Sequence, residues 1–112
     1  MRILDALVMA AEDTTTNIES EAFAVDHMYV GMIQVVWTGT TDGDVKVQVS
    51  NDPFDADSIT WTDLASATLA PGGSASNGVI HLADIGYRTL RLVYTATSGS
   101  GLMTASLFAK GA

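Results

Sequence analysis

The chain has 112 residues, of which 47% are hydrophobic, and it carries a formal net charge of −8 and no cysteine. This length predicts one domain over residues 1–112, with a single core. No apolar run approaches the roughly 18 residues of a membrane-spanning helix, so no membrane partner is expected. The missing cysteines exclude disulfides and thiolate chemistry. Free nucleic acid is not an expected partner either, because phosphate binding needs clustered Lys and Arg.

Charge is distributed unevenly along the chain. Residues 1–63 hold twelve of the thirteen acidic residues against two basic ones, a balance of −10, and residues 64–112 hold one acid against three bases, a balance of +2. Surplus negative charge keeps a protein soluble, which is the simple interpretation. The alternative is that acidic and basic parts meet between neighbouring copies of the protein.

The first element in chain order, residues 1–16, has an apolar start followed by the polar stretch EDTTT. It is interpreted as either a first strand or an attachment arm. Under the arm hypothesis, deletion of residues 2–12 abolishes attachment and leaves the fold intact. The next segment, residues 18–25, carries Glu19 and Glu21 between small and apolar residues, which is typical of a short edge strand protected against wrong pairing.

Residues 28–37 form the most hydrophobic of the predicted strands. Both of its alternating faces are mostly apolar, which is typical of a strand covered twice, either by two layers of its own domain or by its core and a partner subunit. The segment therefore supplies candidates for a subunit interface, which are Met28, Val30, Met32 and Val36.

Two blocks of the pattern strand, glycine-rich turn, strand predict β-hairpins. In the first, residues 33–50, a turn with Gly39 and Gly43 precedes an alternation of valines with polar residues. In the second, residues 87–108, the turn is SGSG, and the predicted core face of the strand before it contains Leu90, Leu92 and Tyr94.

Between these blocks lie two further predicted strands, residues 59–69 with Trp61 in the core and residues 79–82. No long stretch has a 3.6-residue period with helix caps, so little helix is expected. We therefore predict an all-β fold, an antiparallel β-sandwich or jelly roll of about seven or eight strands.

The aspartates before and after the predicted strand that contains Val45, Val47 and Val49 are weak candidates for a calcium site. Calcium needs about six to eight oxygen ligands in one place, which two loops could supply from the same end of a sandwich. Aspartates in turns also bond their own backbone, and this structural interpretation is preferred, so neither a metal nor a cofactor is expected. The candidates are Asp42, Asp44, Asp52, Asp55 and Asp57.

The sequence contains no arrangement typical of catalysis. Its acids lie in turns or at strand ends, whereas glycoside hydrolysis needs two carboxyl groups facing one another in a cleft. His27 and His81 are separated by several strands and have no motif partner for a zinc site or a catalytic triad. We therefore expect a protein that is not an enzyme.

Aromatic and arginine side chains offer binding alternatives. Arg88 and Arg91 complete the interface candidates, because guanidinium groups pair with carboxylates either within a subunit or across an interface. The aromatic residues could form a sugar-stacking platform or the centre of an interface, although most are expected in the core. They are Tyr29, Trp37, Trp61, Tyr87 and Tyr94.

Several short blocks resemble small structural proteins of tailed bacteriophages. These blocks are QVVWTGT at 34–40, VQVSND at 47–52, WTDL at 61–64, RLVYT at 91–95, SGSG at 98–101 and KG at 110–111. The resemblance covers residues 33–111 and implies a β-sandwich virion protein of the capsid-decoration or head-stabilising type. A weaker similarity, carried by VQVSND, WTDL and residues 87–92, is to galactose-binding-like jelly rolls of the discoidin type.

The resemblance implies a non-enzymatic phage protein that is made in the host cytoplasm and becomes part of the virion. We expect it to assemble with itself, as a trimer, and to bind the capsid exterior, with the major capsid protein or other virion proteins as partners. The alternatives are a carbohydrate-binding module of a fibre or spike, which would have a glycan partner, and a tail or head-to-tail connector subunit.

Overall fold

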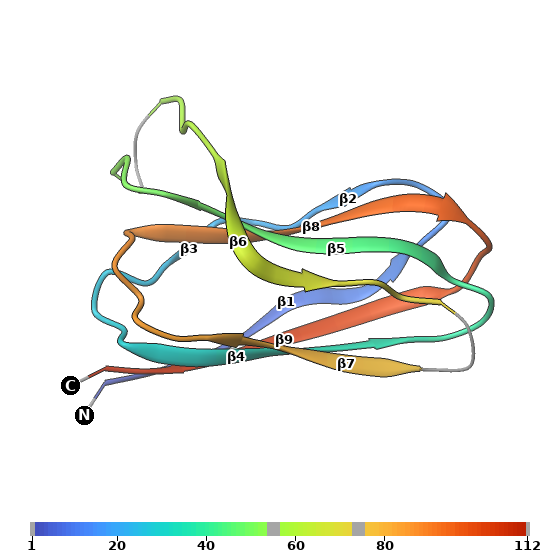
Figure 1. Ribbon diagram of the computed structural model, residues 1–112, viewed down its shortest axis with the longest axis horizontal. Coiled ribbons are helices and arrows are strands. Elements are labelled where there is room, and N and C mark those ends of the chain that lie inside the picture. Colours follow the sequence, from blue (N-terminus) through green and yellow to red (C-terminus); the bar gives the residue numbers. More distant parts are fainter. Residues whose placement is uncertain (1, 54–56, 73–75, 112) are drawn as a thin grey trace.

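The computed structural model describes residues 2–53, 57–72 and 76–111, which form two antiparallel sheets packed face to face (Figure 1). Sheet I contains, in spatial order, β1 (Ile3–Asp13), β9 (Leu102–Lys110), β4 (Val30–Trp37) and β7 (Asn77–Leu82). Sheet II contains β2 (Ile18–Glu19), β8 (Thr89–Ser98), β5 (Asp42–Ser50) and β6 (Thr62–Leu69), and β3 (Phe23–Ala24) also pairs with β8. The predicted all-β sandwich is confirmed.

Strict alternation of side chains builds the core between the sheets. In β8 the side chains of Leu90, Leu92 and Tyr94 are fully buried, as predicted. In β4 one face is buried and the other faces solvent, so this doubly apolar strand is covered on only one side within the subunit. The buried residues of β4 and β9 are Ile33, Val35, Trp37, Met103, Ala105, Leu107 and Ala109.

The two blocks predicted as hairpins are not hairpins, which corrects the sequence interpretation. β4 and β5 belong to different sheets, and so do β8 and β9. β4 pairs with β9 and β5 pairs with β8, so the two blocks pair with each other and cross between the sheets together. The hairpin that does form joins β5 to β6, through a longer loop.

Hydrogen bonds between the two crossing turns hold the bend in this paired ribbon. The Thr40 amide donates to the Ser100 carbonyl at 2.8 Å, and the Thr38 amide donates to the Leu102 carbonyl at 3.0 Å. Gly99, at φ +81°, lies so close to the Thr40 carbonyl that a Cβ there would collide with it. Glycine is therefore required at this point of the bend.

The strand order identifies the sandwich as a jelly roll, in which a long antiparallel ribbon folds over so that its two halves lie in opposite sheets. β1 and β2 flank one side of the ribbon, and β7 and β6 flank the other. Figure 1 shows the crossing turns at one end of the molecule and both chain termini at the other end. No helix within the described ranges has the length and apolarity needed to span a bilayer.

The N-terminal segment is a strand of sheet I. β1 pairs with β9 from Ile3 opposite Lys110 to Asp13 opposite Leu102, with two bulges along the way. Between them it buries both Val8 and Met9. Removal of residues 2–12 would therefore take away an edge strand and part of the core. The expectation that this deletion leaves the fold intact is wrong.

Candidate interaction surface

The outer faces of the two sheets differ in chemistry. Eight large hydrophobic side chains are exposed among the described residues; seven belong to sheet I, and the eighth, Tyr29, directly precedes β4. We call these seven side chains the apolar face: Ile3, Leu7, Met32, Val36, Val79, Leu102 and Phe108.

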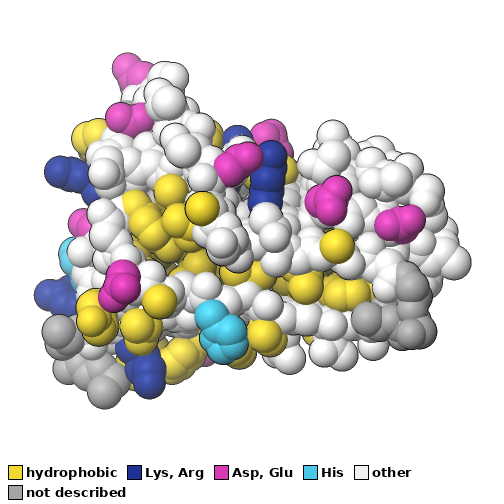
Figure 2. All heavy atoms as spheres, in the orientation of Figure 1, with side chains coloured by type: hydrophobic (Ala, Val, Ile, Leu, Met, Phe, Trp, Pro, Cys, Tyr) yellow, Lys and Arg dark blue, Asp and Glu magenta, His cyan; other side chains and the backbone are white. Residues whose placement is uncertain are grey.

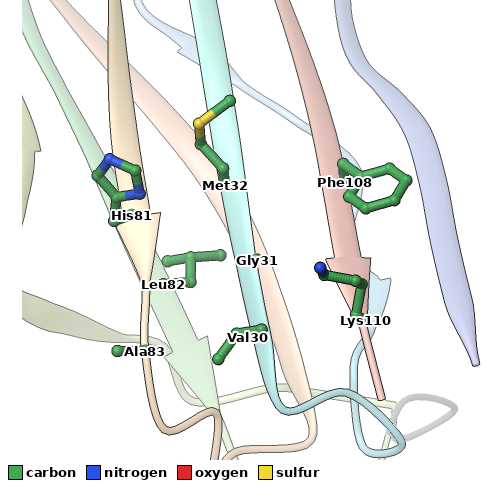
Figure 3. Close-up of a pocket in the computed structure, with 8 residues that line it drawn as sticks. All are labelled: Val30, Gly31, Met32, His81, Leu82, Ala83, Phe108 and Lys110. Carbon is green, nitrogen blue, oxygen red and sulfur yellow. The ribbon is translucent and has the colours of Figure 1, made fainter. Parts of the chain in front are cut away.

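Strand register places part of this face around Met32, which lies opposite His81 on β7 and opposite Phe108 on β9. These three side chains, with Val30 and Lys110, border an open pocket of about 430 Å³ that has mostly apolar walls (Figure 3). The pocket offers one histidine and one lysine as polar groups, with no acid among its lining residues. It is suited to receive an apolar side chain.

Formal charges on the outer side of sheet I are few. Asp5 projects from β1 and Lys110 from β9, and neither forms an ion pair within the described part of the chain. Glu12 and Asp13 are exposed at the other end of β1, where hydrogen bonds from the Thr15 amide and hydroxyl lower the pKa of Asp13. Depletion of charge together with exposed Met and Phe is the composition of an interface core.

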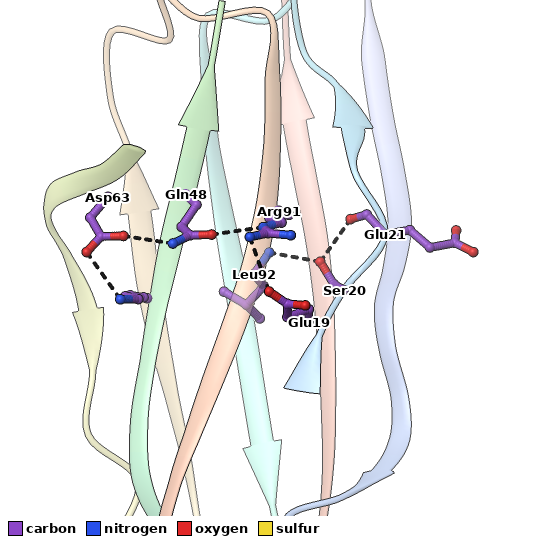
Figure 4. Close-up of polar contacts among 8 residues, drawn as sticks. Glu19, Ser20, Glu21, Gln48, Asp63, Arg91 and Leu92 are labelled. Atoms are coloured by element: carbon purple, nitrogen blue, oxygen red, sulfur yellow. Dashed lines mark hydrogen bonds and ion pairs between the residues drawn. The ribbon is translucent and has the colours of Figure 1, made fainter. Parts of the chain in front are cut away.

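The outer face of sheet II carries a continuous polar network (Figure 4). Arg91 Nε donates to Gln48 Oε1 at 2.8 Å, and Arg91 Nη2 lies 3.2 Å from Glu19 Oε2. Gln48 Nε2 donates to Asp63 Oδ1 at 2.9 Å, and Lys46 Nζ lies 3.2 Å from Asp63 Oδ2. The bonds from Gln48 and Lys46 lower the pKa of Asp63. Four of the charges on this face, those of Glu19, Lys46, Asp63 and Arg91, are thus paired within the subunit, whereas the exposed Asp44 of β5 forms no ion pair among the described residues.

The network corrects the expectation that Trp61 is in the core. Trp61 precedes β6 and is only partly buried, with the Arg91 guanidinium 4.6 Å from its ring centroid. Arg91 therefore takes the within-subunit pairing that the sequence left open. Arg88 is exposed immediately before β8, where its backbone amide donates to the Ser50 carbonyl.

The other sequence-derived interface candidates lie in different parts of the structure. Met32 and Val36 belong to the apolar face, Val30 is half-buried beside it, and Met28 packs against the core. Leu102 and Phe108 of β9 were not among the sequence-derived candidates, because the sequence does not place β9 beside β4. Strand order, which brings β1, β9 and β4 together, supplies that information.

The calcium candidates do not converge. Asp42 and Asp44 lie at the start of β5 and Asp52 lies beyond its end, so at roughly 3.3 Å per residue the strand separates them by more than about 20 Å. Asp52 Oδ2 instead accepts a hydrogen bond from the Thr60 amide at 2.7 Å. Asp57 is exposed, and Asp55 lies outside the described residues. Within the described ranges no three His, Asp or Glu side chains come together as a metal site.

The aromatic side chains do not form a common platform either. Trp37 and Tyr94 are buried in the core, Tyr87 is half-buried, Trp61 lies beneath Arg91 and Tyr29 is exposed. Figure 2 shows that the hydrophobic side chains visible from its side instead form a band along the sandwich, between β6 and β7. A second hollow, of about 220 Å³, lies between these two strands.

No protein-family model matches the sequence, and no curated protein matches it. Among solved structures, the chain is similar to the SPBc2 prophage-derived protein YomS, with a TM-score of 0.62 and 11% identity over 97% of this chain and 95% of that one. It is also similar to VP2 in a subviral particle of infectious bursal disease virus, with a TM-score of 0.56 and 14% identity over 98% of this chain.

A chain in the structure of the Gx strain of the same virus gives a TM-score of 0.54 at 12% identity. This chain corresponds to only 32% and 31% of the two viral chains, so it matches one part of each. At such low identities these similarities show the fold alone.

Proposed function

We propose that the protein is a non-enzymatic structural component of a phage virion, of the capsid-decoration type, and that it assembles through the apolar face. The observation that carries the proposal is the apolar face itself, seven exposed large hydrophobic side chains on one sheet. Exposed apolar patches of this kind mark interaction surfaces in soluble proteins. Similarity in fold to a prophage-derived protein and to a subviral-particle protein supports a role in a particle.

The placement of reactive side chains supports a structural role over an enzymatic one. His81 faces outward from β7, His27 Nε2 lies 3.3 Å from Asp26 Oδ1, and the loop aspartates lie at opposite ends of β5. Catalysis by acids, bases or nucleophiles needs such groups within hydrogen-bonding reach of one another. The described residues instead offer packing surface.

The free energies of burial and of association favour assembly on a repeating lattice. Full burial of a large apolar side chain contributes about 1.5–3 kcal/mol, so burial of what remains exposed on the seven contributes roughly 5–10 kcal/mol in all. Loss of translational and rotational freedom costs about 4–15 kcal/mol on association. A single contact through this face is therefore weak, and several contacts made together on a capsid would raise the effective affinity.

The test is to purify virions produced from the genome that encodes this chain and to count its copies by quantitative mass spectrometry. We expect many copies per particle for the natural chain and a large loss for Met32→Asp, which places a charge beside Phe108 within the apolar face. Thr68→Asp, on the exposed side of β6 in sheet II and opposite Lys46, is the matched control and should be incorporated normally. Absence of the natural chain from purified particles would refute the proposal.

Copy number also separates the alternative roles. A low number of copies arranged in a ring would favour a tail or connector subunit. A carbohydrate-binding module would need an exposed aromatic platform, and the described aromatic side chains are dispersed over the core and both sheets.

A further inference from the structure

We infer that the apolar face is covered by a second copy of the same chain, packed face to face about a two-fold axis that pairs Asp5 of each subunit with Lys110 of the other. The inference rests on the proposed function in one respect, the assignment of assembly to this face. It goes further by naming the occupant and the residues that set the register.

The two charged residues of the apolar face, Asp5 and Lys110, are complementary to those of a second copy. Asp5 lies opposite Phe108 in the β1–β9 register, and Lys110 lies opposite Ile3, so the two charged residues are diagonal neighbours. Diagonal neighbours in a sheet are about 7–8 Å apart, and this acid and this base form no ion pair with each other or elsewhere in the described chain. One acid and one base left unpaired on a face are self-complementary, because a two-fold axis between them forms the same ion pair twice.

Such an axis also brings apolar side chains of the two copies together. The axis passes between Asp5 and Lys110. It therefore lies beside Phe108, which is opposite Asp5 on the neighbouring strand and two residues before Lys110. Residues close to a two-fold axis meet their own copies, so Phe108 packs near the partner subunit's Phe108. Ile3 and Met32 are the apolar register neighbours of Lys110 and Phe108, and they extend the contact on either side.

The outer face of sheet II offers a second copy less complementary charge than the apolar face does, because its bases Lys46 and Arg91 are already paired within the subunit. The chain carries a net charge of −8, and the Glu19, Lys46, Asp63 and Arg91 side chains of sheet II already have partners within the subunit. On the apolar face near this axis, Asp5 and Lys110 balance each other. Glu12 and Asp13 lie at the far end of β1, away from the axis.

The area is sufficient for a specific contact of low affinity. Four strands about 4.8 Å apart, with roughly eight residues of about 3.3 Å each, give a face of roughly 500 Å² per subunit. Two such faces give a total near the ~1,000 Å² at which specific interfaces begin. Two-fold pairing also predicts a dimer as the unit of assembly, in place of the trimer expected from sequence.

Charge reversal tests the pairing directly. Asp5→Lys leaves two lysines on the face and Lys110→Glu leaves two acids, so each variant alone should self-associate at least about tenfold more weakly than the natural chain in sedimentation equilibrium, because like charges then face each other. A mixture of the two variants should recover association, because every Lys then faces an acid. Thermal unfolding of each variant verifies that it is folded.

Recovery in the mixture is the result that only the pairing of two copies of this face predicts. A mixture that associates no better than its components would overturn the inference, and so would a natural chain that is monomeric at every concentration up to its solubility limit. Either result leaves the virion role intact if the chain is still counted in particles. Conversely, a recovered dimer of a chain that is absent from particles would refute the virion role and retain the dimer.

Discussion

At the scale of residues, two tyrosines, one within β8 and one just before it, show how differently one side chain type can be used. Tyr94 is fully buried in β8, and its hydroxyl donates to the Asp42 carbonyl at 3.0 Å. The Tyr87 hydroxyl is buried without a hydrogen-bond partner among the described residues. Burial raises the pKa of both, and the nearby Asp42 and Asp44 charges add to the effect on Tyr94. Both phenols therefore stay neutral at physiological pH.

This contrast predicts opposite effects of the same substitution. Tyr94→Phe should lower the free energy of unfolding by about 0.5–1.5 kcal/mol, because it removes the part-buried hydrogen bond from the Tyr94 hydroxyl to the Asp42 carbonyl. Tyr87→Phe should leave the stability unchanged or raise it slightly, because it removes a polar atom that is buried without a partner. Denaturant unfolding of the two variants, run side by side, measures the difference; equal destabilisation would contradict the assignment.

Sequence reasoning worked at the residue scale where alternation alone decides burial. The inward residues Leu90, Leu92 and Tyr94 of β8 were predicted correctly because period-2 patterns depend only on the strand itself. It failed for Trp61, whose position depends on Arg91, a residue of another strand. A large aromatic side chain is placed in the core by default, and a guanidinium that stacks on it from outside gives no local signal.

At the scale of elements, the ribbon of β4–β5 and β8–β9 depends on its two crossing turns. The Gly99 and Gly101 backbones approach the Thr40 and Thr38 carbonyls too closely to admit a side chain. Inside the same bend, the Thr14 and Thr41 hydroxyls are hydrogen-bonded at 2.8 Å and buried. The bend is thus a packed structure and not a loose loop.

The bend predicts a strong effect of a minimal substitution. Gly99→Ala should destabilise the protein by more than about 1 kcal/mol, because it adds a collision with the Thr40 carbonyl to the strain of a positive φ. Gly86→Ala is the matched control, since its Cβ would meet only the Asp84 carbonyl at 3.8 Å, an ordinary contact. Thermal unfolding midpoints compare the two, and a Gly99→Ala protein as stable as the control would show that the turns do not constrain the ribbon.

The strands themselves were largely predictable, and their partners were not. Glycine-rich turns between alternating segments predict a reversal of the chain, and a reversal within one sheet has the same local sequence as a crossing between two sheets. The choice between them depends on which distant strand is available. Here β9 occupies the hydrogen-bonding edge of β4 that β5 would need in a hairpin.

At the scale of the whole molecule, the jelly roll separates two kinds of surface. Sheet II carries two ion pairs within the subunit, Arg91–Glu19 and Lys46–Asp63, and sheet I carries the apolar face, whose Asp5 and Lys110 form no ion pair among the described residues. The doubly apolar character of β4 was predicted from the sequence, and the meeting of copies on its outer face stays a prediction. The contributions of β1, β7 and β9 became visible only when strand order placed them beside β4.

The central claim, that the apolar face is the contact surface of the assembled protein, is tested most directly by hydroxyl-radical footprinting with mass spectrometry. The measurement compares the oxidation rates of single side chains in dilute protein with those in concentrated protein or on the particle. The account predicts slower oxidation of Met32, Phe108 and Leu7 on assembly, and unchanged rates for Trp61 on sheet II. Unchanged rates on the apolar face, with protection at Trp61 instead, would contradict it.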